Sequence, residues 1–199
     1  MRILNFVFLF LTILMISCNQ GDKAGKNGSA AGEGSSENIV MDENESEKAA
    51  REMQEKAEEL VKLAPTSEDD MKALLPDELL GGKRSSIQTT TAMGTGSAMA
   101  QYDINDSTQL VVTIYDCGGP GGAGMYTNNY KSLFDTEKTT DTETKRIVEF
   151  DGKKGIEQCS KIEKACNLTY FTGKRFLISL NGDGLGGDEL VRASEELIQ

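Results

Sequence analysis

The chain has 199 residues, a formal net charge of −11 and neither histidine nor tryptophan. The acidic balance argues against nucleic acid as a partner, because affinity for a phosphate backbone depends on clustered lysine and arginine. Without histidine there is no Ser-His-Asp or Cys-His catalysis and no histidine-ligated zinc, so carboxylates, lysines, tyrosines and lone thiols are the groups left for chemistry. We expect no cofactor and no conventional metal site.

The first 18 residues have the pattern of an export signal. Arg2 precedes a mainly apolar run from Ile3 to Ile16, and Ser17-Cys18 is followed at once by polar, glycine-rich sequence. A cationic start, a short apolar run and a small residue before the cleavage point are typical of secretory signals. An uncleaved membrane anchor is the less favoured alternative, because a spanning helix needs about 20 apolar residues and this run is shorter.

The segment Met15-Ile16-Ser17-Cys18 resembles the bacterial lipoprotein signal, in which cleavage occurs before a cysteine that carries a diacylglyceryl thioether. The family usually has leucine three residues before that cysteine, where this chain has Met15. The resemblance covers residues 1–18 only. It implies that residues 1–17 are removed and that Cys18 is lipidated, which anchors the mature chain through its acyl groups outside the cytoplasm of a bacterial cell. By analogy with enterobacterial sorting, Asn19 after the cysteine favours the outer membrane if the cell is Gram-negative.

Residues 18–43 comprise the lipidated cysteine and a segment dominated by Gly, Ser, Ala, Asn and Lys, which predicts a flexible tether. A helix is expected next, from Glu45 to Ala64, with a capping box at Asn44 and Glu47 and a stop at Pro65. Its alanine-rich apolar stripe is expected to pack on its own domain, with a partner as the alternative. Ser67 should cap a second, shorter helix that runs through Leu75.

Beyond Gly82 the apolar period changes from 3.6 to 2, which predicts strands. A hairpin is expected from residues 98–104 and 110–114, and the remaining strands are expected at 85–92, 145–151, 155–160, 167–172 and 174–180. A helix-like segment should follow at 125–134, and a final helix at 188–198, capped by Asp188, should pack on the sheet. We therefore predict that residues 44–199 form one α+β domain, an antiparallel sheet of about five to seven short strands packed by an N-terminal and a C-terminal helix.

Three cysteines remain once Cys18 is lipidated. Cys159 and Cys166 are the favoured disulfide pair, because six intervening residues can turn and place two neighbouring strands opposite one another. Cys117 would then be free and buried, or paired with an exogenous thiol. A catalytic role is not favoured, because Cys117 has no base to activate it.

The glycine-rich run from Gly118 to Gly124 fits the pattern G-x-G-x-x-G, but the preceding strand belongs to a predicted hairpin rather than to a βαβ unit. Nucleotide binding is therefore not expected, and the run is interpreted as a mobile loop whose bare amides could border an anion-binding surface. Asp116, Cys117, Gly119 and Gly121 are the residues of this speculative surface site.

The segment from Asn181 to Glu189 is rich in oxygen ligands, and Asn181, Asp183 and Asp188 make a weak calcium candidate. The register of a helix-loop-helix calcium site fails, because its fifth and twelfth positions would be Leu185 and Arg192. A glycine-rich turn from strand to helix is the favoured reading.

Three functions remain open. The favoured hypothesis is a non-enzymatic envelope lipoprotein whose domain binds another envelope protein or a small ligand. The second is an extracytoplasmic enzyme that uses carboxylates such as Asp103, Asp106 or Asp116, with Asp116 beside the glycine run in the best position. The third is a structural or stress-related envelope component with no discrete ligand.

Overall fold

The computed structural model describes residues 43–92, 94–130 and 138–197. The expected signal, the lipidated Cys18 and the expected tether lie outside these ranges. The chain divides into two units, Met1–Val40 and Met41–Gln199, and the described residues belong to the second unit. None of the described helices combines the length and the apolar character needed to cross a membrane.

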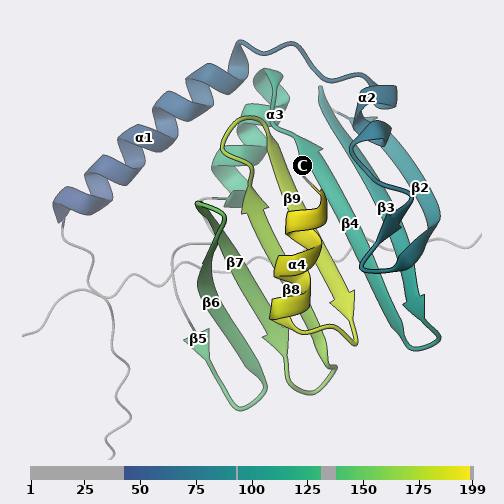
Figure 1. Ribbon diagram of the computed structural model, residues 1–199. Coiled ribbons are helices and arrows are strands. Elements are labelled where there is room, and N and C mark those ends of the chain that lie inside the picture. The colour runs from purple at the N-terminus through teal and green to yellow at the C-terminus, as the bar shows by residue number, and fades with distance from the viewer. Residues whose placement is uncertain (1–42, 93, 131–137, 198–199) are drawn as a thin grey trace, which may run out of the picture. The chain divides into compact units, whose positions relative to one another are not determined.

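The described strands form one antiparallel sheet with the order β1-β2-β3-β4-β9-β8-β7-β6-β5 (Figure 1). Two meanders meet at its centre, where β4 pairs with β9 in a register that sets Val112 opposite Leu180 and Ile114 opposite Ile178. The strands are β1 (Glu78–Leu79), β2 (Gly82–Ala92), β3 (Thr95–Asn105), β4 (Thr108–Asp116), β5 (Lys138–Thr139), β6 (Glu143–Phe150), β7 (Lys153–Ser160), β8 (Ala165–Phe171) and β9 (Phe176–Asp183).

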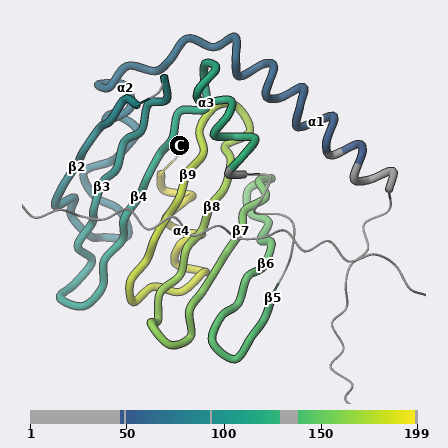
Figure 2. Tube along the Cα trace, turned by 180° about the vertical axis from the view of Figure 1, so that it is seen from behind, coloured from purple at the N-terminus to yellow at the C-terminus, as the bar shows by residue number. Residues whose placement is uncertain are grey.

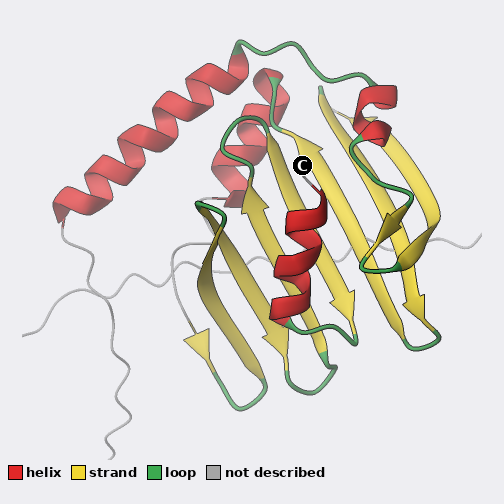
Figure 3. Ribbon diagram, in the orientation of Figure 1, coloured by secondary structure: helices red, strands yellow, loops and turns green. Residues whose placement is uncertain are grey.

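The helices are few and cover only parts of the sheet (Figure 3). They are α1 (Glu43–Val61), α2 (Glu68–Ala73), α3 (Gly119–Met125) with the π-helical turn η1 (Tyr126–Tyr130), and α4 (Gly187–Leu197). Side-chain hydrogen bonds cap the N-terminal ends of α2 and α4. The Ser67 hydroxyl accepts a hydrogen bond from the Asp70 amide at 3.2 Å, and the Glu189 carboxylate accepts one from the Gly186 amide at 2.8 Å.

The predicted fold class is wrong. The domain is mostly β, with a single nine-stranded antiparallel sheet, rather than an α+β domain in which an N-terminal and a C-terminal helix pack on a sheet of about five to seven short strands. Two strands were missed because β1 and β5 have two residues each, too few to show a period of 2. The predicted packing of the N-terminal helix over the sheet is wrong as well, because α1 packs mainly on α3 and η1 and meets the strands near its C-terminal end.

The predicted hairpin of β3 and β4 is confirmed, with Ala100 opposite Val112 and the Asn105 side chain accepting a hydrogen bond from the Ser107 amide in the turn. The predicted mobile glycine loop is wrong, because most of that run forms α3. In α3 a Cβ on Gly122 would lie 2.5 Å from backbone atoms of Asp116 and Cys117, so glycine permits a helix to lie against the end of β4.

The core lies on both faces of the sheet. Alternate residues of the central strands face α2 and α4, and this larger cluster includes Tyr102, Leu110, Val112, Leu168, Tyr170 and Leu180, all without solvent exposure. The intervening residues Phe171 and Leu177 face the opposite way and pack with Leu60 of α1 and Ala123 of α3. The C-terminal half of the α1 stripe therefore packs within its own domain. Figure 2 shows the sheet from behind, the side opposite the view of Figure 1.

Candidate functional site

Asp116 was the favoured candidate for a catalytic carboxylate on sequence grounds. It lies at the end of β4 and has no solvent exposure. Its Oδ1 accepts hydrogen bonds from Arg175 Nε at 2.7 Å and the Gly118 amide at 2.8 Å. Its Oδ2 accepts from Arg175 Nη2 at 2.8 Å and the Thr66 amide at 2.7 Å. The Arg175 guanidinium also donates to the Ala64 carbonyl. The ion pair therefore ties the segment after α1 to the ends of β4 and β9.

The surroundings of Asp116 favour its ionised form. Burial by itself would raise the pKa of this carboxyl, but the guanidinium of Arg175 and the amides of Thr66 and Gly118 outweigh burial and hold the pKa below its ordinary value. A proton acceptor must reach its substrate, whereas the oxygens of this carboxylate are enclosed and already accept four hydrogen bonds. The geometry suits Asp116 to joining three segments of the chain.

The rest of the speculative surface site is also packed inside the domain. Cys117 has no solvent exposure, and burial raises the pKa of its thiol to about 12, so the thiol is almost fully protonated at neutral pH and a poor nucleophile. Gly119 is buried near Pro65, with φ of +79°, and Gly121 is half-buried in α3. The four residues are neighbours, but they form the junction between α3 and the sheet.

Cys159 and Cys166 are directly opposite one another on β7 and β8 and form a disulfide, with a Cα–Cα distance of 4.1 Å. The bond joins neighbouring strands beside α4.

The oxygen ligands of the weak calcium candidate are spread over two faces of the sheet. The Asn181 side chain accepts a hydrogen bond from Asn167 Nδ2 at 2.7 Å on the face opposite α4, and Asp183 shares that face by strand alternation. Asp188 lies in the first turn of α4, over the other face. Within residues 43–92, 94–130 and 138–197 no three or more Asp, Glu, Cys or His side chains gather as metal ligands.

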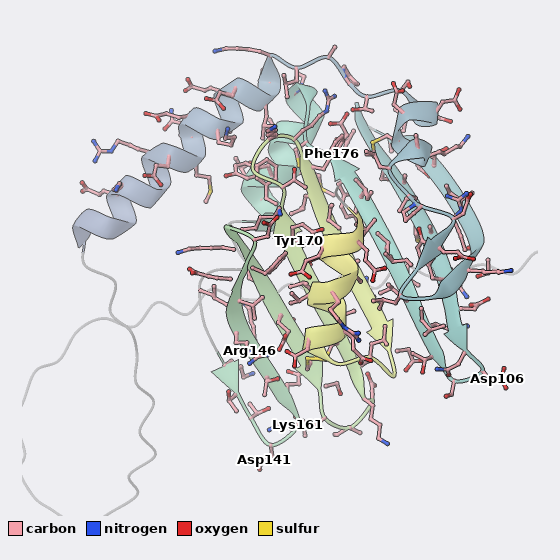
Figure 4. The ribbon with its side chains drawn as sticks, in the orientation of Figure 1. Asp106, Asp141, Arg146, Lys161, Tyr170 and Phe176 are labelled. Carbon is pink, nitrogen blue, oxygen red and sulfur yellow. A yellow bond between two sulfur atoms is a disulfide. The ribbon has the colours of Figure 1, made fainter. Side chains whose placement is uncertain are left out.

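Asp103 and Asp106, the other carboxylates considered for catalysis, are exposed on the β3–β4 hairpin, and Asp106 lies at its tip (Figure 4). Asp103 accepts hydrogen bonds from Gln101 and Gln109 beside it. Neither carboxylate is placed beside Asp116, so the structure does not assemble the three into one site.

Sequence reasoning missed the buried carboxylate of Glu157 on β7. Glu157 is 4% exposed and forms a bidentate ion pair with Arg146, with distances of 2.7 and 3.1 Å. It lies directly under the start of α4, because a Cβ on Gly187 would approach its Oε2 to 1.8 Å. The sequence offered one signal, a carboxylate at an inward position of a predicted strand.

Asn167, Thr169, Ser179 and Asn181 form a polar network on the sheet face opposite α4. Asn167 Nδ2 donates to Ser179 Oγ at 3.0 Å as well as to Asn181, and Thr169 Oγ1 donates to Asn167 Oδ1 at 3.0 Å. These side chains satisfy much of one another's hydrogen-bonding capacity, which leaves less of it for a ligand.

The surface best suited to binding is an open hollow of about 490 Å³ between α2 and β2, here named the α2–β2 groove. Its volume is within the range of about 300–1,000 Å³ that is usual for ligand sites. Two ion pairs, Asp69 with Lys72 and Asp77 with Arg84, contribute to a lining that is otherwise apolar. The lining residues are Asp69, Lys72, Ala73, Leu75, Pro76, Asp77, Arg84 and Ile87.

A second hollow of about 240 Å³ is formed by the β6–β7 hairpin itself, from Glu149 to Lys154. It is smaller and is enclosed by a single turn, so the α2–β2 groove is the better candidate. In comparisons with family models, with curated proteins and with solved structures, no match was found for this chain.

Proposed function

We propose that this protein is a lipid-anchored component of a bacterial cell envelope whose domain binds another envelope protein without catalysing a reaction. The anchor is the acylated Cys18, the tether is the glycine-rich segment after it, and the membrane is the outer membrane if the cell is Gram-negative. The observation that supports binding is the α2–β2 groove, an open hollow with a mixed apolar and charged lining beside the unpaired side of β2.

The positions of the reactive groups support the same proposal. Asp116 is enclosed by four donors and Cys117 is buried with a raised pKa, so the two groups best suited to chemistry in the sequence have structural roles. A groove on a domain that is tethered to the membrane would bind a partner protein close to the membrane surface.

The test uses the full-length, lipidated protein in its native envelope, with a photo-crosslinking amino acid at Ala73 in the groove. The matched control carries the same amino acid at Asp106, which is exposed at the tip of a hairpin outside the groove. We expect one protein to be captured reproducibly from Ala73 and not from Asp106, and to be displaced by excess unlabelled protein.

Failure to capture any protein from either position would refute the proposal of a protein partner. The anchor is tested separately by metabolic labelling with palmitate: the wild-type chain should take up label, and a Cys18→Ala chain should not. Equal labelling of both chains would refute lipidation at Cys18.

A further inference from the structure

We infer that the α2–β2 groove binds an extended segment of a partner protein as an added antiparallel strand on β2. The inference rests on the proposed function and defines the chemistry of the partner. In strand addition, main-chain hydrogen bonds supply affinity and pockets for alternate side chains supply specificity. Three features of the domain support this mode of binding.

The first feature is the unpaired side of β2. β1 pairs only with Gly82 and Lys83, and the Arg84 amide donates to the Asp77 carbonyl at 2.9 Å. From Ser85 to Ala92 no described strand lies on the outer side. The pairs Ala92–Thr95, Thr91–Gly96 and Thr89–Ala98 set the register with β3. We take the closing pair as the hydrogen-bonded one, and the alternation of an antiparallel ladder then turns the backbone groups of Thr91, and likewise of Thr89 and Ile87, outward.

The second feature is that residues 85–92 of this edge carry no charged side chain and no proline. Natural edge strands are blunted by charged side chains or proline, yet Ser85–Ala92 has neither in a chain of which 27% of residues are charged. The strands near the opposite edge of the sheet do carry charged side chains, because β6 has Lys145, Arg146 and Glu149. A bulge between Arg84 and Ser86 confines the regular, open part of the edge to the threonine-rich half of β2.

The third feature is the position of the groove beside that edge. Ile87 belongs both to the edge and to the groove lining, and the apolar side chains of Ala73 and Pro76 come from α2 and the segment after it. Successive side chains of a strand point to opposite faces, so every second side chain of an added strand would face α2. Apolar side chains at these positions would meet Ile87, Ala73 and Pro76, beside the charged side chains of the groove.

Charge further defines the partner. The segment that borders the groove, residues 66–84, has five acidic and three basic residues, an excess of two negative charges. A lysine or arginine at each end of the added strand complements this excess. A second copy of β2 fits less well, because two strongly acidic domains would approach one another. The acidic residues are Glu68, Asp69, Asp70, Asp77 and Glu78, and the basic residues are Lys72, Lys83 and Arg84.

The test is amide hydrogen exchange on the full-length chain in detergent micelles, with the synthetic peptide Lys-Val-Thr-Val-Thr-Val-Lys as the probe. We expect the outward amides of Thr89 and Thr91 to exchange at least about tenfold more slowly when the peptide is bound, and the inward amide of Thr90 to change less. The same peptide with alternate N-methylated valines, which cannot donate those hydrogen bonds, should have no effect.

A Thr91→Pro chain should lose binding of the peptide, because proline removes an outward donor and is tolerated at an edge position. Thr91→Ala is the matched control, since it keeps the amide, and it should still bind. No slowing by the unmodified peptide would refute strand addition. If capture from Ala73 persisted in that case, the proposed function would stand without it.

Two further outcomes would also refute the inference. Amides that are already slow in a monomeric chain without peptide would identify a segment of the chain itself as the occupant. Slow exchange that depends on protein concentration and accompanies dimer formation in sedimentation would identify a second copy.

Discussion

Replacing Asp116 by asparagine removes the charge at the centre of the junction between α3, β4 and β9. Breaking a buried ion pair by removing one partner costs about 3–5 kcal/mol, because the remaining charge is left uncompensated. The Arg175 side chain is 23% exposed and can regain part of its hydration, which lowers this loss. The asparagine also leaves one of two amides, those of Thr66 and Gly118, without its acceptor, at a cost of about 1 kcal/mol. We expect Asp116→Asn to lower the free energy of unfolding by about 3–4 kcal/mol at pH 7.

The sign of the pH dependence follows from the lowered pKa of Asp116 in the folded state. Such a carboxyl contributes stability above its unfolded pKa of about 4, and that contribution is lost as the pH falls through the lower folded pKa. The difference between the wild-type and Asp116→Asn chains should therefore be largest near neutral pH and should narrow below about pH 4.

The assay is urea unfolding of residues 18–199, produced without a lipid, at a series of pH values, with the unfolding followed by circular dichroism. Asp106→Asn is the matched control, because Asp106 is exposed at a hairpin tip and its replacement should change the unfolding free energy by less than about 0.5 kcal/mol. A loss below about 1 kcal/mol for Asp116→Asn at pH 7, or a loss that does not narrow in acid, would refute the structural role assigned to this carboxylate.

Three other changes test packing at single positions. Gly122→Ala should lower the free energy of unfolding in urea by about 1–3 kcal/mol, because its Cβ would lie 2.5 Å from backbone atoms. Gly124→Ala is the control and should be neutral or stabilising, because a Cβ there would have nothing within 4 Å. Equal effects would contradict the packing of α3. Gly187→Ala should lower the free energy of unfolding by about 1–3 kcal/mol in the wild-type chain and by much less in a Glu157→Ala chain, because the added Cβ meets the Glu157 carboxylate. Additive effects in the double-mutant cycle would show that the two residues do not touch. In a Cys18→Ala chain, Cys117 should react with iodoacetamide at pH 8 only after denaturation, and rapid reaction of the folded chain would contradict its burial.

The local sequence pattern was sufficient to predict most of the helices and strands. The strands β2 to β4 and β6 to β9 lie within a few residues of their predicted ranges, and α4 was predicted at residues 188–198 and runs from Gly187 to Leu197. These segments could be predicted because alternation and helical spacing are properties of neighbouring residues. Cys159 and Cys166 were nominated as a pair on the same local ground, two cysteines at the ends of a short turn.

The prediction of a loop at residues 118–124 was wrong for a physical reason. Glycine has low helix propensity, so residues 118–124 read as a loop, and only close contact with the end of β4 makes a backbone without side chains the better solution there. The role of Asp116 was missed for a related reason. Its partner Arg175 is 59 residues away, and nothing in either local sequence indicates that the two ends of β4 and β9 lie together.

The composition of reactive groups, the signal-like pattern of the first 18 residues and the positions of the long strands could be read from the chain, because each depends on residue type or on short spacing. The single sheet, its β4–β9 centre, the enclosure of Asp116 and Glu157, and the open edge of β2 beside the α2–β2 groove are visible only in the folded domain. Those features depend on which strands become neighbours, and pairing between distant strands is selected by the packing of a whole core rather than by any local pattern.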